Sequence, residues 1–119
     1  MVDFDVEINN HLQWRTIIES VVSGDVSIEI PGDLIMSDKH CQLGHWLYSP
    51  ESASYKGNFH FNLLISDHKK FHLLSSEIVA AYKQGDFQTI HELLDDFYSV
   101  SDKVIDSLKQ LKELALNDL

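Results

Sequence analysis

Apolar residues recur at helical spacing along three long stretches of the chain, and this periodicity limits the possible folds more than any other feature. Residues 3–22 and 87–116 carry apolar side chains at spacings of three, four and seven. A period near 3.6 residues places such side chains on one side of a helix. Residues 58–83 have the broadest such helix face. It comprises Phe61, Leu64, Ile65, His68, Phe71, His72, Ile78, Val79 and Tyr82. The pattern predicts an all-α fold in which these faces pack together.

A first irregular connection follows the first predicted helix. Gly24 and Asp25 end the helix of residues 3–22. Residues 24–38 contain two glycines and a proline, which favour a loop. Within this loop, residues 26–30 alternate between apolar and polar side chains, as a short extended segment does.

A short helix is predicted next. Asp38 can cap a helix of about ten residues that carries Cys41 and Trp46. This helix has to end before Pro50, because proline disfavours helical backbone in the residue before it. The small and polar residues 49–57 then predict a second loop.

The two longest predicted helices form a hairpin. Gly85 closes the first of them and Asp86 caps the second, which is typical of an antiparallel helical pair. Helix propensity falls at residues 99–101, so a break in the last helix is expected there. The chain as a whole predicts a four-helix-type antiparallel bundle with an additional short helix, forming one domain over residues 1–119.

Charge and cysteine content narrow the possible partners and the compartment. The chain has 9 basic and 19 acidic residues, for a formal net charge of −10. Such a surface repels phosphate and anionic lipid, so we expect neither nucleic acid nor membrane as a partner. No run approaches the roughly 20 apolar residues that span a bilayer, and no signal-peptide pattern is present. The single cysteine, Cys41, is expected in a reducing cytoplasm.

Four side chains suited to metal binding fall on three of the predicted helices. His68 and His72 are four residues apart, which places both imidazoles on one helix face. His11 lies on the apolar face of the first helix, and Cys41 lies on the short one. One thiolate and three imidazoles form a soft, four-coordinate set that suits Zn²⁺. Each of these residues alone also fits an ordinary core, as a hydrogen-bonded histidine or a packed cysteine, so the zinc hypothesis depends on their convergence.

The residues around these side chains resemble a known family. The chain resembles the chemoreceptor zinc-binding (CZB) domain of bacterial sensory proteins, over essentially its whole length. The motifs that carry the resemblance are His11-x-x-Trp14, Cys41-x-Leu-Gly44-x-Trp46 and His68-x-x-Phe-His72. The resemblance implies that the zinc ligands are His11, Cys41, His68 and His72.

The other motif positions and the other histidines are expected to serve differently. Trp14 and Trp46 are expected to wall the site and exclude water, and Gly44 suggests a close approach to the backbone. His45 is four residues from Cys41 and could compete as a ligand. We expect none of the remaining histidines to be a ligand; they are His40, His45, His60 and His91.

The resemblance also implies a regulatory function. Zinc binding would alter a signalling output, in either chemotaxis or cyclic-di-GMP synthesis, and the protein is not expected to be an enzyme. A zinc-bound thiolate is open to oxidation, so hypochlorous acid is a possible second input. The chain carries no receptor or cyclase region, and we expect a freestanding regulator that acts on a signalling partner. A homodimer is expected as well, with Val104, Leu108 and Leu111 as either its interface or simple core.

Other functions remain open on the residues alone. A hemerythrin-like di-iron bundle would use His91 and Asp95, but a cysteine ligand does not belong to that pattern. A cysteine–histidine hydrolase would need an orienting third residue and an oxyanion device, and neither is recognisable. A plain helical interaction module would bury the same four polar side chains without a metal.

Overall fold

The computed structural model describes residues 2–24 and 41–117. Within these ranges all regular structure is helical, which confirms the all-α prediction. The helices are α1 (Phe4–Val22), α3 (Gln42–Leu47), the 3₁₀ helix η1 (Pro50–Tyr55), α4 (Phe59–Lys83) and α5 (Phe87–Asn117). The predicted loop at 24–38, its extended segment at 26–30, the cap at Asp38 and His40 lie wholly or mostly outside the described residues.

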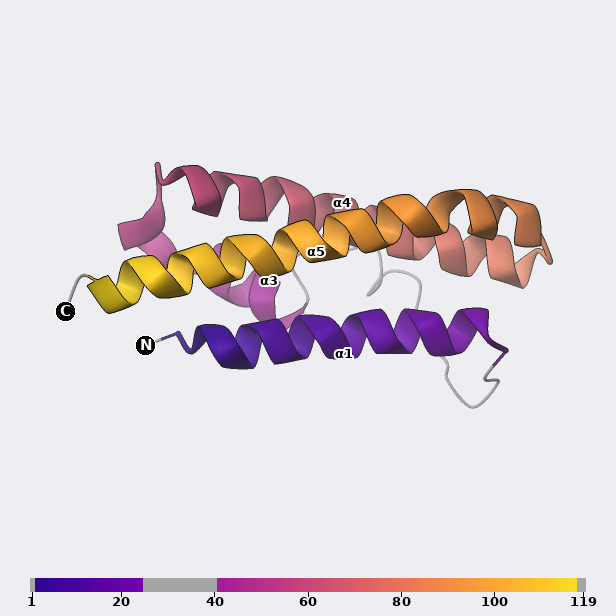
Figure 1. Ribbon diagram of the computed structural model, residues 1–119, viewed down its shortest axis with the longest axis horizontal. Helices are drawn as coiled ribbons and strands as arrows, with labels where there is room; N and C mark the ends of the chain where they lie inside the picture. The colour runs from indigo at the N-terminus through magenta and orange to yellow at the C-terminus, as the bar shows by residue number, and fades with distance from the viewer. Residues whose placement is uncertain (1, 25–40, 118–119) are drawn as a thin grey trace.

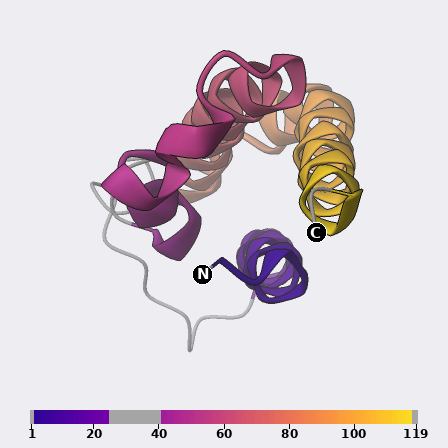
Figure 2. The ribbon, with the colours of Figure 1, turned by 90° about the vertical axis from the view of Figure 1, so that its left-hand side faces the viewer.

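Three long helices define an elongated bundle with extents of 50 × 23 × 20 Å. Figure 1 shows α1, α4 and α5 running along the long axis, with α4 and α5 joined at one end as a hairpin. Seen end-on in Figure 2, α1 lies opposite this hairpin, and α3 and η1 lie on the side between α1 and α4. The short helices therefore occupy the fourth side of the bundle at one end only.

Helix α1 is capped by Asp3 at its start and ends before Gly24, as the sequence predicts for its end. The Asp3 side chain accepts hydrogen bonds from the backbone N–H groups of Asp5 at 3.0 Å and Val6 at 3.3 Å. These bonds satisfy two of the donors that every helix leaves unpaired at its start. Gly24 follows the helix with φ 91°, a left-handed conformation that glycine adopts without strain.

The short helix differs from its prediction. It covers six residues, Gln42–Leu47, rather than about ten, and its N-cap is Cys41. The Sγ atom of Cys41 accepts the backbone N–H of Gly44 at 3.2 Å. A sulfur acceptor at an N-cap is unusual, and it fixes the cysteine side chain at the point where α3 begins.

The predicted loop at residues 49–57 contains the 3₁₀ helix η1 instead. Pro50 starts this helix, because its fixed φ angle suits the first helical position. The Ser52 hydroxyl is fully buried and donates to the carbonyl of Leu47 at 2.9 Å. This bond ties η1 back to the end of α3.

The α4–α5 hairpin is confirmed, but the break predicted in the last helix is wrong. Gly85 has φ 71°, and the Asp86 carboxylate accepts the N–H of Thr89 at 3.1 Å to cap α5. The helix then continues without interruption through residues 99–101. Val100 and Ser101 are buried there, and packing outweighs the small propensity deficit of single residues.

The core consists of two apolar clusters, one on each side of the site described below. In the first, the rings of Phe71 and Phe97 stack with centroids 5.2 Å apart. The second gathers around Trp46 and also contains residues of α5. Its α5 members Val104, Leu108 and Leu111 are completely buried within the chain, so they are core residues and not a dimer surface.

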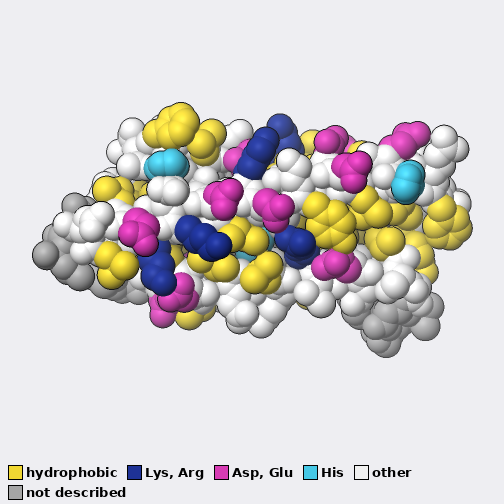
Figure 3. Space-filling model, in the orientation of Figure 1, with side chains coloured by type: hydrophobic (Ala, Val, Ile, Leu, Met, Phe, Trp, Pro, Cys, Tyr) yellow, Lys and Arg dark blue, Asp and Glu magenta, His cyan; other side chains and the backbone are white. Residues whose placement is uncertain are grey.

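The outer surface carries mixed charge. Figure 3 shows acidic and basic side chains interspersed on the face viewed there, with groups of apolar side chains between them. Of the helices that the structure describes, none combines the length and the apolar character that a membrane crossing requires.

Candidate metal centre

Helix α4 presents His68 and His72 on its buried face, one turn apart. Their side chains are 1% and 2% exposed. The two Nε2 atoms approach to 3.1 Å, and the rings lie edge to face with centroids 4.6 Å apart. The helical spacing thus brings two nitrogen donors to one point, as predicted.

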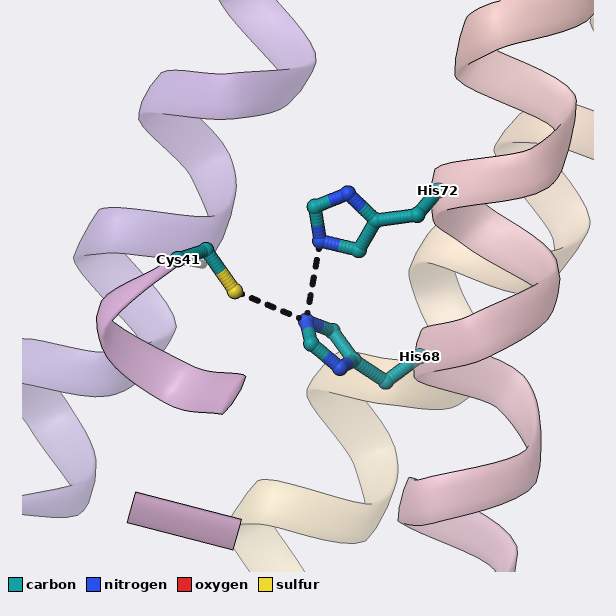
Figure 4. A group of neighbouring side chains, drawn as sticks. All are labelled: Cys41, His68 and His72. Carbon is teal, nitrogen blue, oxygen red and sulfur yellow. Dashed lines mark hydrogen bonds between the residues drawn. The ribbon is translucent and has the colours of Figure 1, made fainter. Parts of the chain in front are cut away.

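Cys41 meets this pair from the opposite side. Its Sγ atom lies 3.1 Å from Nε2 of His68, and the side chain is 7% exposed. Figure 4 shows the sulfur and the two imidazoles pointing toward one another from the start of α3 and from α4. One donor atom from each of the three residues lies within 4.8 Å of the other two. Within the described part of the chain, these three form the group suited to a metal ion.

His11 lies beside this group but is not part of it. Its side chain is 3% exposed and lines the same cavity, of about 290 Å³, as Cys41, His68 and His72. Its Nε2 atom is 2.8 Å from the hydroxyl of Ser101. The structure therefore brings three of the four predicted ligands together and places the fourth at the cavity wall.

The donors of the three-residue group fit zinc in chemistry, and two of their three separations come near the spacing of zinc ligands. A tetrahedral zinc site with bonds of about 2.0–2.3 Å separates its ligand atoms by about 3.3–3.6 Å. The two separations of 3.1 Å around His68 come close to that range. Sulfur and imidazole nitrogen are the ligands zinc prefers, and all three side chains are buried.

The two tryptophans have different positions. Trp14 lines the cavity, and its ring meets the His72 ring edge-on at 6.1 Å, so it walls the site as expected. Trp46 instead packs edge-on against Phe4 and Phe61, at 5.5 and 5.9 Å. It is five positions after Cys41, which turns it about 140° around the helix axis, away from the site.

The other histidines that the structure describes lie apart from the cavity. His45 and His91 are exposed, and His60 is half-buried on the outside of α4. Asp95, which the di-iron alternative paired with His91, is exposed as well. The cavity lining includes none of these residues, so the described part of the chain places His91 and Asp95 away from the candidate metal centre.

Two polar residues near the site were missed by sequence analysis. Ser101 is completely buried on α5, at a position that suggested only a weak point in the helix. Glu7 is 5% exposed, one turn before His11, and accepts a hydrogen bond from Gln42 at 3.4 Å. Burial raises its pKa above the ordinary value. Glu7 could have been found in the sequence from its spacing of four residues from His11, which places both side chains on one face of the helix.

The buried position of His11 gives the metal-free protein a pH dependence. Burial, followed by the nearby His72 and Arg15, lowers the pKa of His11 from 6.5 to about 4. The unfolded chain therefore binds a proton that the folded one rejects as the pH falls from 6.5 toward 4. Metal-free protein should lose up to about 3 kcal/mol of unfolding free energy over this window. Urea unfolding near pH 7 and near pH 4.5 measures the loss, and an equal loss in His11→Gln would contradict its assignment to His11.

The comparisons with known proteins agree with this site. The model of the chemoreceptor zinc-binding domain, CZB, matches residues 11–79. Comparison with the curated proteins and with the solved structures gave no match. The match covers more than half of the chain and runs from His11 through both α4 histidines, while α5 lies beyond it. The chain belongs to the chemoreceptor zinc-binding family, and its cofactor is zinc.

Proposed function

We propose that residues 1–119 form a single regulatory domain that holds one Zn²⁺ through His11, Cys41, His68 and His72. The convergence of three buried donor atoms within 4.8 Å supports this proposal most directly. His11 is the fourth ligand, because it lines the same cavity as the other three. Bound zinc would hold the cysteine as thiolate and link α1 and α4 through the start of α3.

A closed donor set suits sensing better than catalysis. Three neutral imidazoles and one thiolate leave a site of net charge about +1 with no open position for a substrate water. The four side chains come from three elements, namely α1, the start of α3, and α4, which supplies both His68 and His72. Gain or loss of the metal would therefore change how these elements pack. On this basis the domain is a sensor and not an enzyme.

The output of this sensor is proposed to be bacterial signalling in the cytoplasm. The family name associates the domain with chemoreceptors, and control of chemotaxis or of cyclic-di-GMP synthesis is the function we infer. The domain would act on a receptor or cyclase partner and form a homodimer. The acidic balance of the chain, −10 in all, disfavours nucleic acid and membrane surfaces as partners.

Metal content tests the ligand set. Purified wild-type protein should contain about one zinc per chain, and Cys41→Ala and His72→Ala should contain far less after dialysis, because each removes one of four bonds. His91→Ala is the matched control, since its side chain is exposed. Elemental analysis gives the result. Unchanged zinc in both ligand variants would sink the proposal, and two irons per chain would favour the hemerythrin-like alternative.

Oxidation tests the second input. Hypochlorous acid should convert the Cys41 thiolate to sulfenic acid with release of chloride, and the site should then lose zinc. A zinc-responsive dye would record the release, and mass spectrometry would locate the added oxygen. The buried sulfur, 7% exposed, predicts slower reaction than a surface thiol. If modest excess of oxidant neither modifies Cys41 nor releases zinc, redox sensing fails while zinc binding stands.

A further inference from the structure

A buried hydrogen bond joins α5 to the metal centre. The hydroxyl of Ser101 lies 2.8 Å from Nε2 of His11, and the two side chains are 0% and 3% exposed. The described lining of the cavity comes from α1, α4 and the start of α3. Helix α5 therefore reaches the metal centre through His11 rather than through a ligand of its own.

This contact determines which nitrogen His11 can offer. A neutral imidazole carries a proton on one nitrogen and a lone pair on the other, and the partner of the first nitrogen selects the tautomer. Ser101 lies outside the cavity lining, so Nε2 is directed at α5 while the ring itself borders the cavity. The ring also packs against Phe71, with centroids 4.4 Å apart, which limits its rotation. Nδ1 is the nitrogen that remains for a metal.

We propose that Ser101 is a positioning residue for His11: it accepts the Nε2–H and thereby presents Nδ1 to the metal. The inference rests on the proposed function, in which His11 is the fourth ligand. Ligating histidines commonly donate their second N–H to a fixed acceptor, which orients the ring and raises its basicity. A serine hydroxyl on a long rigid helix supplies that acceptor here.

The same contact couples metal occupancy to α5. Two exposed contacts follow it at successive turns of α1: Arg15 pairs with Asp102 at 3.2 Å, and Glu19 accepts the Tyr98 hydroxyl at 2.9 Å. Together they fix the register of α1 against α5. Of these three contacts between α1 and α5, the His11–Ser101 hydrogen bond is the buried one. A shift of His11 toward the metal would therefore pull on α5 at Ser101.

Zinc affinity tests the positioning role. Competition with a chromophoric chelator should show that Ser101→Ala binds zinc about 10-fold or more weakly than wild type, as loss of an outer hydrogen bond does at other sites. Ser107→Ala is the matched control, because Ser107 is also buried on α5, at 4% exposure. Its affinity should equal that of wild type. Unchanged or tighter binding in Ser101→Ala would overturn the proposal, and tighter binding would mean that Ser101 competes with the metal for His11.

Two further measurements separate this inference from the proposed function. If His11→Ala leaves zinc affinity unchanged, the proposed ligand set itself is wrong. If His11→Ala weakens zinc binding, the double variant His11→Ala/Ser101→Ala should bind zinc as tightly as His11→Ala alone. A further loss of affinity in the double variant would contradict the proposal that Ser101 acts through His11. Nitrogen-15 spectra of zinc-loaded wild-type protein give a readout that does not depend on how the variants fold. They should show His11 ligated through Nδ1, and ligation through Nε2 would refute the positioning role.

Discussion

Removal of zinc should lower the unfolding free energy of this protein by about 4 kcal/mol or more, if wild type is compared at free zinc about 1,000-fold above its Kd. The reason is that the metal would bind the folded chain and would link side chains from separate elements. The donors Cys41 and His72 come from separate elements, the start of α3 and the middle of α4. Without metal, their burial leaves polar atoms crowded in an apolar cavity.

Thermal unfolding followed by helical circular dichroism measures this effect. Chelation should lower the Tm by more than about 10 °C in a chain of this size, and stoichiometric zinc should restore it. Cys41→Ala is the control, because its Tm should respond little to either treatment. A chelated wild-type protein that is verified metal-free and keeps its Tm would show that the bundle does not depend on the metal.

Truncation of Phe97 should be the most destabilising single change in the core away from the metal ligands. The Phe97 side chain is 0% exposed and stacks on Phe71. Phe97→Ala would leave a cavity that rigid helices cannot close, at a cost of about 3–5 kcal/mol in unfolding free energy. Urea unfolding of zinc-loaded protein measures this cost.

Phe87→Ala provides the matched control for that change. Phe87 belongs to the same helix, but its side chain is 64% exposed. Its truncation should change the unfolding free energy by less than about 0.5 kcal/mol. Similar losses in both variants would mean that α5 does not pack as described.

The sequence was sufficient to predict the three long helices and their order, but not the 3₁₀ helix η1 or the length of α3. The apolar face of α4 and the turn at Gly85 are strong local signals, and local signals are what a sequence records directly. The errors occur where tertiary packing decides. Helix α5 continues through Ser101 because that residue is buried, and Cys41 caps α3 because its sulfur is held near Gly44.

The site could be predicted only in part, for a similar reason. His68 and His72 share a helix, so their spacing alone places them together. The position of His11 relative to them depends on how α1 packs, and the structure shows it bonded to Ser101 instead of within the three-residue group. A partner 90 positions along the chain leaves no local pattern in the sequence. Ser101 was missed because no local pattern marks it. Glu7 was missed because its only signal is a spacing of four residues from His11.

X-ray absorption at the zinc edge tests the central claim most directly, because it counts the atoms bound to the metal in the intact protein. The proposed ligand set of Cys41 with His11, His68 and His72 predicts one sulfur at about 2.3 Å and three nitrogens at about 2.0 Å. The sulfur contribution should vanish in Cys41→Ala protein reloaded with zinc. A zinc shell without sulfur in the wild-type protein would contradict the account.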